Sequence, residues 1–159
     1  MIARPASEAV RLGLVGATAI WLWLLAVDLV AGAPMHTSAM IGRDLLGIIL
    51  PDVHTSLVER VIAFTIAHYA FWLLVGRLVV RAITADARSP GTLIGATVIF
   101  ILLQFLFVGI TQIFNETLLR GYAWPALFGG NVIGLLLVGA YLLRRHPDLP
   151  SQLRRDGNA

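Results

Sequence analysis

Four long apolar runs divide the chain, at about residues 12–33, 57–82, 91–114 and 122–145. Each run has at least the roughly 20 residues that a helix needs to cross the hydrocarbon core of a membrane. Backbone polar groups in lipid must bond within their own segment, so apolar runs of this length are predicted to be helical. The pattern therefore predicts an all-α protein, an integral membrane four-helix bundle that forms a single domain.

A shorter segment between the first two runs has a different pattern. Residues 38–50 can form about three helical turns, which are too few to cross a membrane. The apolar positions of this segment share one side: Met40, Ile41, Leu45, Ile48 and Ile49. Arg43 and Asp44 lie together away from that side. We therefore expect a short interfacial or re-entrant helix here.

Polar residues mark two boundaries of the predicted helices. Ser56 and Glu59 have the spacing of a capping box, in which each side chain bonds to the backbone amide of the other residue. This motif predicts that the second long helix begins directly after Ser56. Residues 146–159 are polar and are predicted to form a loosely ordered tail.

The first apolar run also has features of a secretory signal. Arg4 and Arg11 resemble a basic leader, and Ala31-Gly32-Ala33 has the form of a cleavage site. However, the run is longer than the roughly 7 to 15 apolar residues of a signal peptide. Pro34 would also hinder cleavage after Ala33. The sequence thus favours a retained first transmembrane helix.

Composition agrees with a membrane protein and argues against nucleic acid as a partner. Hydrophobic residues make up 58% of the chain and charged residues only 13%. All basic side chains are arginine, and they flank the apolar runs, where they orient helices and contact anionic headgroups. The predicted partner is therefore the lipid bilayer. The chain has no cysteine, which excludes disulfides and thiolate metal sites.

The arginines predict an orientation in the cell inner (cytoplasmic) membrane. Nine fall on one side of the predicted spans: Arg4, Arg11, Arg77, Arg81, Arg88, Arg144, Arg145, Arg154 and Arg155. Three fall on the other side: Arg43, Arg60 and Arg120. Because cytoplasmic segments carry the excess of basic residues, both termini are predicted to be cytoplasmic. The segment 38–50 then lies in the first outer loop.

An internal similarity indicates a duplicated hairpin. Leu14–Ile20 matches Leu93–Ile99 at five of seven positions, and Leu73–Gly76 matches Leu136–Gly139 at all four. The second alignment also places His68 opposite Asn131. These matches predict two parallel tandem helical hairpins, the first with an insertion in its outer loop, related by an axis along the membrane normal. The alternative is chance, since leucine, valine and glycine are common in membrane helices.

Several polar residues lie near the middle of the predicted spans and form a predicted midplane polar cluster: His68, Gln104, Asn131, Thr97 and Thr111. Three of them, Thr97, Gln104 and Thr111, lie in the predicted helix 91–114, where their heptad spacing places them on one face. Polar groups at this depth find no water and bond to each other or to backbone carbonyls. The simplest expectation is that they hydrogen-bond neighbouring helices together.

Two more specific hypotheses use the same residues. In the first, His68 is the axial ligand of a haem or chlorophyll, since imidazole commonly ligates haem iron. Aromatic residues would line that pocket: Tyr69, Phe71, Trp72, Phe105 and Phe107. A bis-histidine site is excluded because the equivalent position holds Asn131, a poor iron ligand. In the second hypothesis, a polar axis through Gln104 and Asn131 serves a small transporter or channel.

Asp28 lies inside the first predicted span, at roughly 9 Å from the midplane by helix rise. A carboxylate at this depth is costly unless it is paired. Arg43 and Arg60 lie on the same outer side, so we expect one of them to form an ion pair with Asp28. The other acidic and histidine residues of the outer side lack metal-ligand spacing, and no metal site is predicted.

Small residues at four-residue spacing predict close helix contacts, within the bundle or between protomers. The pairs are Gly130 with Gly134, Gly13 with Ala17, and Ala63 with Ala67.

The sequence favours a function that does not involve catalysis. It shows no nucleophile with a base, no paired midplane carboxylates and no metal triad. We therefore expect a small multi-pass membrane protein without enzymatic activity, either a small oligomer or an accessory subunit of a larger membrane complex. The alternatives are the tetrapyrrole-binding module with His68 and the small transporter or channel.

Overall fold

The computed structural model describes residues 5–51, 54–85, 123–145 and 147, and the regular secondary structure in these ranges is helical throughout. The helices are α1 (Pro5–Val30), α2 (His36–Ile49), α3 (Leu57–Ala85) and α5 (Ala123–Arg145). The all-α prediction is confirmed for this part of the chain. Three of these helices, α1, α3 and α5, are long and apolar enough to cross a membrane. The predicted helix at 91–114, and the predicted tail except Pro147, lie outside the described residues.

The ends of α1 differ from the prediction of 12–33. The described helix already includes Pro5, seven residues before the predicted boundary, and Glu8 in its first turn interacts favourably with the helix dipole. It ends at Val30, because Gly32 adopts a left-handed conformation with φ 72°. The Gly32 amide donates to the Leu29 carbonyl at 3.1 Å, and the Ala33 amide donates to the Asp28 carbonyl at 2.9 Å. These two bonds form a Schellman motif, which terminates the helix before the predicted boundary.

The start of α3 agrees with the prediction. The Ser56 amide donates to Glu59 Oε2 at 2.6 Å, and the Glu59 amide donates to Ser56 Oγ at 3.3 Å. The predicted capping box is therefore confirmed. At its other end α3 continues to Ala85, three residues beyond the predicted boundary.

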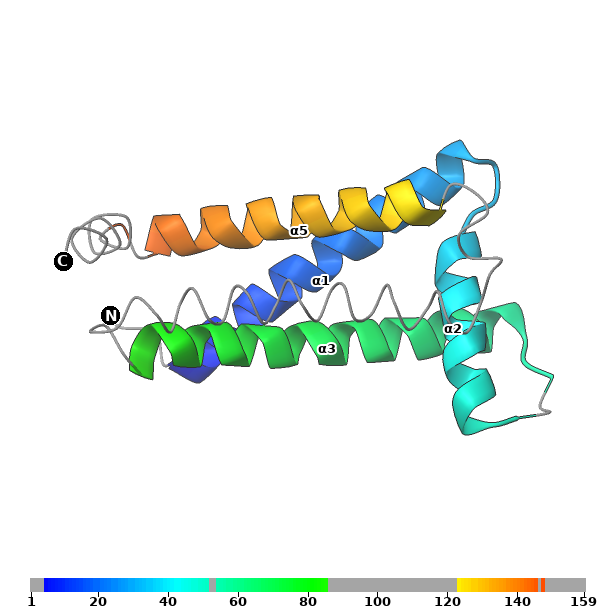
Figure 1. Cartoon of the computed structure of the whole chain (residues 1–159), viewed down its shortest axis with the longest axis horizontal. Helices are drawn as coiled ribbons and strands as arrows, with labels where there is room; N and C mark the ends of the chain where they lie inside the picture. The colour runs from blue at the N-terminus through cyan, green and yellow to red at the C-terminus, as the bar shows by residue number, and fades with distance from the viewer. Residues whose placement is uncertain (1–4, 52–53, 86–122, 146, 148–159) are drawn as a thin grey trace.

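Helix α1 is the centre of the described fold. It runs obliquely between α3 and α5 and packs against both of them (Figure 1). Helix α2 lies across the end of the bundle at which α1 finishes and α3 begins, and it packs mainly against α3. The beginning of α1 and the final turns of α3 and α5 lie at the opposite end (Figure 1).

Glycine allows the backbones of α1 and α3 to touch. A Cβ atom on Gly13 would lie 2.6 Å from the Trp72 carbonyl oxygen and 2.8 Å from the Leu73 Cα. On α3, a Cβ atom on Gly76 would overlap the Ala9 carbonyl oxygen. The neighbouring Trp72 is only 2% exposed and belongs to the buried core. This contact is the close approach that small residues at helix interfaces permit.

The GxxxG motif of α5 is used within the chain. A Cβ atom on Gly130 would lie 3.0 Å from Trp23 Cδ1, and one on Gly134 would lie 2.9 Å from Ile20 Cδ1. Trp23 Nε1 also donates to the Ala126 carbonyl at 2.7 Å. Side chains of α1 therefore pack against this motif. Its glycines make contacts within the bundle, one of the two kinds of contact predicted for the small residues.

The internal duplication stays a prediction, because residues 93–99 lie outside the described part. The aligned glycines that are described have different surroundings. Gly76 touches the backbone of α1, whereas a Cβ atom on Gly139 would meet no described atom within 4 Å. If the hairpins arose by duplication, the two copies have diverged in packing.

Candidate functional site

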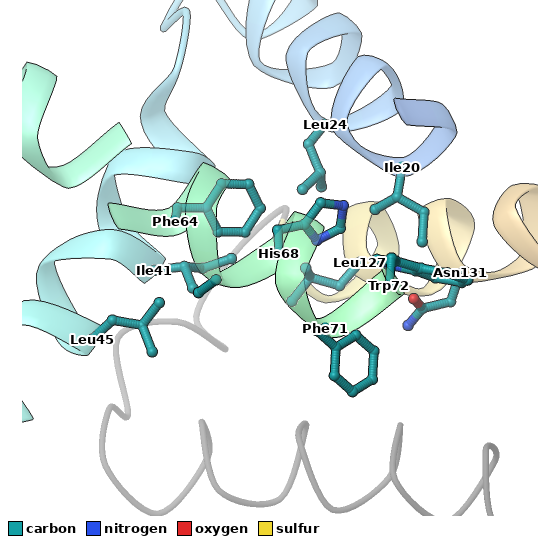
Figure 2. Close-up of a pocket in the computed structure, with 11 residues that line it drawn as sticks. Ile20, Leu24, Ile41, Leu45, Phe64, His68, Phe71, Trp72, Leu127 and Asn131 are labelled. Atoms are coloured by element: carbon teal, nitrogen blue, oxygen red, sulfur yellow. The ribbon is translucent and has the colours of Figure 1, made fainter. Parts of the chain in front are cut away.

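A cavity of about 260 Å³ lies where α1, α2, α3 and α5 meet (Figure 2). Its wall is mainly apolar and aromatic. The lining residues are Ile20, Leu24, Ile41, Leu45, Phe64, Ala67, His68, Phe71, Trp72, Leu127 and Asn131. The cavity therefore contains two of the predicted midplane residues, His68 and Asn131.

Helical spacing explains how the four helices build this wall. Residues four apart lie on the same helix face. α1 contributes Ile20 and Leu24 at this spacing, α2 contributes Ile41 and Leu45, and α5 contributes Leu127 and Asn131. α3 contributes a longer stripe that begins at Phe64 and continues through Trp72. The cavity thus depends on the relative positions of all four described helices.

The hydrogen bond of His68 determines its tautomer. His68 Nε2 lies 3.0 Å from the carbonyl oxygen of Ala17 in α1. A carbonyl oxygen only accepts, so Nε2 carries the proton and donates, and Nδ1 of the neutral ring is an acceptor with a lone pair. Figure 2 shows this second ring nitrogen turned away from α1. The ring stacks on Phe64, with centroids 5.1 Å apart, and meets Trp72 edge-on.

Asn131 is the other polar side chain of the wall. Within the described residues, its amide makes no hydrogen bond. Nearby polar groups are paired: Trp21 Nε1 donates to Thr65 Oγ1 at 3.2 Å, and the hydroxyls of Thr18 and Tyr69 lie 3.0 Å apart. Among the described residues that line the cavity, His68 Nδ1 and the Asn131 amide therefore offer hydrogen-bonding capacity to an occupant.

The structure brings together only part of the predicted polar cluster. His68 and Asn131 share the cavity, but the hydrogen bond of His68 goes to Ala17. Gln104, Thr97 and Thr111 lie outside the described residues. The backbone carbonyl as partner was within the general expectation for a midplane histidine. The sequence does not show which carbonyl accepts the bond, because every residue of α1 has a carbonyl group.

The tetrapyrrole hypothesis for His68 stays a prediction. The cavity of about 260 Å³ lies below the roughly 300–1,000 Å³ typical of pockets for drug-sized ligands. His68 Nε2 is also engaged with the Ala17 carbonyl. Phe105 and Phe107, two of the aromatic residues proposed for that pocket, lie outside the described residues.

Asp28 has a different partner from the one predicted. Its side chain is only 4% exposed, and both carboxylate oxygens accept hydrogen bonds from Thr37. The Thr37 amide donates at 2.8 Å and the Thr37 hydroxyl at 2.6 Å. Arg43 instead pairs with Asp44 at 3.3 Å, and Arg60 donates to Thr55 at 2.9 Å. The structure therefore corrects the expected ion pair of Asp28 with Arg43 or Arg60.

The physical reason for this difference is the N-terminus of α2. Thr37 is the second residue of that helix, where backbone amides have no partner within the helix. Met35, at the N-cap, has φ 65° and makes no side-chain cap. Asp28 supplies the missing acceptor from the preceding helix, and its charge interacts favourably with the helix dipole. The short spacing between Asp28 and Thr37-Ser38 is a sequence feature that could have indicated this contact.

Metal binding finds no support in the ranges that the structure describes, where no group of three histidine, cysteine or acidic residues could hold an ion. Comparison with known protein families, with characterised proteins and with solved structures gives no match for this chain. Its function is therefore inferred from its own residues and their geometry.

Proposed function

We propose that this chain is a small four-span protein of the inner membrane, in which α1, α3 and α5, together with the helix predicted from the sequence at 91–114, cross the bilayer. The supporting observation is the apolar outer surface of α1, α3 and α5. Leu22 of α1 is 54% exposed, Ile66 of α3 is 65% exposed and Leu136 of α5 is 67% exposed. Large exposed apolar surfaces are rare on soluble monomers. On helices of this length, they suit contact with lipid.

The charged ends of the helices support an orientation with cytoplasmic termini. The beginning of α1 and the final turns of α3 and α5 share one end of the described bundle (Figure 1). By their positions in the chain, these segments contain Arg11, Arg77, Arg81, Arg144 and Arg145, whereas Arg43 belongs to α2 and Arg60 to the first turn of α3. The richer end faces the cytoplasm under the positive-inside rule. Helix α2 crosses the other end of the bundle, and this position suits an interfacial helix at the outer surface.

The proposed role is that of a small oligomer or an accessory subunit of a larger membrane complex, without enzymatic activity. The sequence contains no nucleophile with a base and no paired midplane carboxylates. Gly13, Gly76, Gly130 and Gly134 are engaged within the chain, so contacts with other subunits would use the exposed apolar faces. Transport along a polar axis is the competing proposal, and it depends on Gln104 as well as Asn131.

Single-cysteine labelling tests the membrane topology, because the natural chain contains no cysteine. We expect His54→Cys to react with a membrane-impermeant maleimide in cells whose outer barrier has been opened. Pro147→Cys should react only after the inner membrane is disrupted. Both residues are exposed, so burial does not limit their reactivity. Leu136→Cys, on the lipid-facing surface, serves as the control that needs denaturant to react.

The opposite labelling pattern for His54→Cys and Pro147→Cys would reverse the proposed orientation. Extraction of the wild-type chain from membranes by alkaline carbonate would refute membrane embedding.

Stoichiometry tests the subunit role. The full chain, extracted with its surrounding lipid from native membranes, is expected to have a fixed mass above that of a single 17.2 kDa chain. Native mass spectrometry would identify either multiples of this mass or a constant additional subunit. A uniform 17.2 kDa species under these conditions would contradict the proposed role.

A further inference from the structure

The volume of the cavity suits a small molecule. An engineered cavity of about 150 Å³ lined by Leu, Ile and Phe binds benzene in another protein. The present cavity, at about 260 Å³, has room for one aromatic ring and a short substituent. This comparison sets the scale of the ligand at a single substituted ring.

The cavity wall favours an aromatic ligand. Phe64, Phe71 and Trp72 contribute their rings, and the rings of Phe71 and Trp72 meet edge to face with centroids 6.2 Å apart. Aromatic rings prefer offset or edge-to-face arrangements, which several neighbouring rings can offer together. Isoleucine and leucine side chains complete the apolar wall (Figure 2).

The polar groups define the functional group that the ligand carries. Among the described residues that line the cavity there is no aspartate, glutamate, lysine or arginine, so these residues offer no counter-ion to a charged ligand. His68 Nδ1 is an acceptor, because Nε2 donates to Ala17. Ketone and ether oxygens cannot donate to Nδ1, whereas a hydroxyl group can. Asn131 adds amide donors on the α5 side of the same cavity.

We propose that this cavity binds a neutral phenol-class ligand: a single aromatic ring that carries a hydroxyl group and a short apolar substituent. The ring packs among Phe64, Phe71 and Trp72, and the hydroxyl donates to His68 Nδ1. Asn131 donates to an oxygen of the ligand. The inference goes beyond the proposed subunit role, because it depends on the cavity and not on partners or topology.

The test uses 4-propylphenol and the matched hydrocarbon propylbenzene, which lacks the hydroxyl. The full chain, labelled with ¹⁵N-histidine in detergent micelles, is titrated with each probe. The His68 Nδ1 resonance is identified by its absence in His68→Phe. We expect 4-propylphenol to move this resonance saturably, whereas propylbenzene alone does not move it. Partition of either probe into detergent would not by itself produce a saturable shift.

Affinity provides the second readout. Propylbenzene is measured by its competition against the shift caused by 4-propylphenol. We expect 4-propylphenol to bind about tenfold more tightly, the difference associated with one additional hydrogen bond. Asn131→Leu should weaken binding of the phenol by about the same factor while the His68 resonance still shifts. Equal affinity of the two probes, or no saturable shift, would overturn the proposal.

Matched alanine variants control for effects on folding. Ala67→Leu adds volume to the cavity wall and is expected to abolish the saturable shift. Ala140→Leu makes the same change at an exposed position of α5 that does not line the cavity, and it should leave binding unchanged. Far-UV circular dichroism and gel filtration confirm that each variant is folded. Retained binding in folded Ala67→Leu would place the phenol elsewhere and refute the assignment.

Discussion

Replacing Gly76 with leucine is expected to lower the free energy of unfolding by about 3 kcal/mol. The Cβ atom of any larger residue would overlap the Ala9 carbonyl and lie 2.8 Å from the Gly13 amide nitrogen. Both are backbone atoms, which cannot rotate away as a side chain can, so α1 and α3 must separate. The loss would be measured in detergent micelles by denaturant titration, with far-UV circular dichroism as the signal.

Gly139→Leu is the matched control for this change. Gly139 aligns with Gly76 in the proposed duplication, but a Cβ atom there meets no described atom within 4 Å. We expect little loss of stability, or a gain of up to about 1 kcal/mol from the better helix propensity of leucine. Equal destabilisation by both substitutions would mean that the α1–α3 contact does not limit stability.

Asp28→Ala is expected to lower the free energy of unfolding by about 3 kcal/mol, because it leaves two buried donors of Thr37 unpaired. Asp28→Asn retains one acceptor oxygen and should cost less. A reporter cysteine at Ala39, a buried position of α2, should react faster with maleimide in the Asp28→Ala background as the start of α2 loosens. Both measurements use the full chain in micelles.

Asp44→Ala provides the comparison for Asp28. It removes a carboxylate that pairs with Arg43, whose side chain is 49% exposed. Ion pairs exposed to this degree typically contribute about 1 kcal/mol or less to stability. If Asp28→Ala were no more damaging than Asp44→Ala, the Asp28–Thr37 contact would not be the anchor of α2.

The helices could be predicted from the sequence because their signals are local. Apolar runs of sufficient length predicted α1, α3 and α5, and the Ser56–Glu59 spacing located the start of α3. The end of α1 was predicted three residues too late. Gly32 was considered there only within a cleavage-site pattern, although glycine commonly ends helices by taking a left-handed conformation.

The candidate site could be predicted only in part, because its contacts join residues far apart in the chain. His68 and Asn131 were identified by their depth in apolar runs, and they do share a cavity. The bond from His68 to Ala17 depends on how α1 crosses α3, which the apolar pattern does not determine. The prediction for Asp28 gave weight to opposite charge and overlooked that a helix N-terminus also stabilises a carboxylate.

Helix α2 connects one end of the described bundle to its interior. Its first turn is fixed by Asp28, and its middle is held at Gly42, where a Cβ atom would overlap the Arg60 carbonyl. The same helix supplies Ile41 and Leu45 to the cavity wall. A displacement of α2 therefore changes the volume of the cavity. By thermodynamic reciprocity, whatever fills the cavity also changes how readily α2 leaves its place.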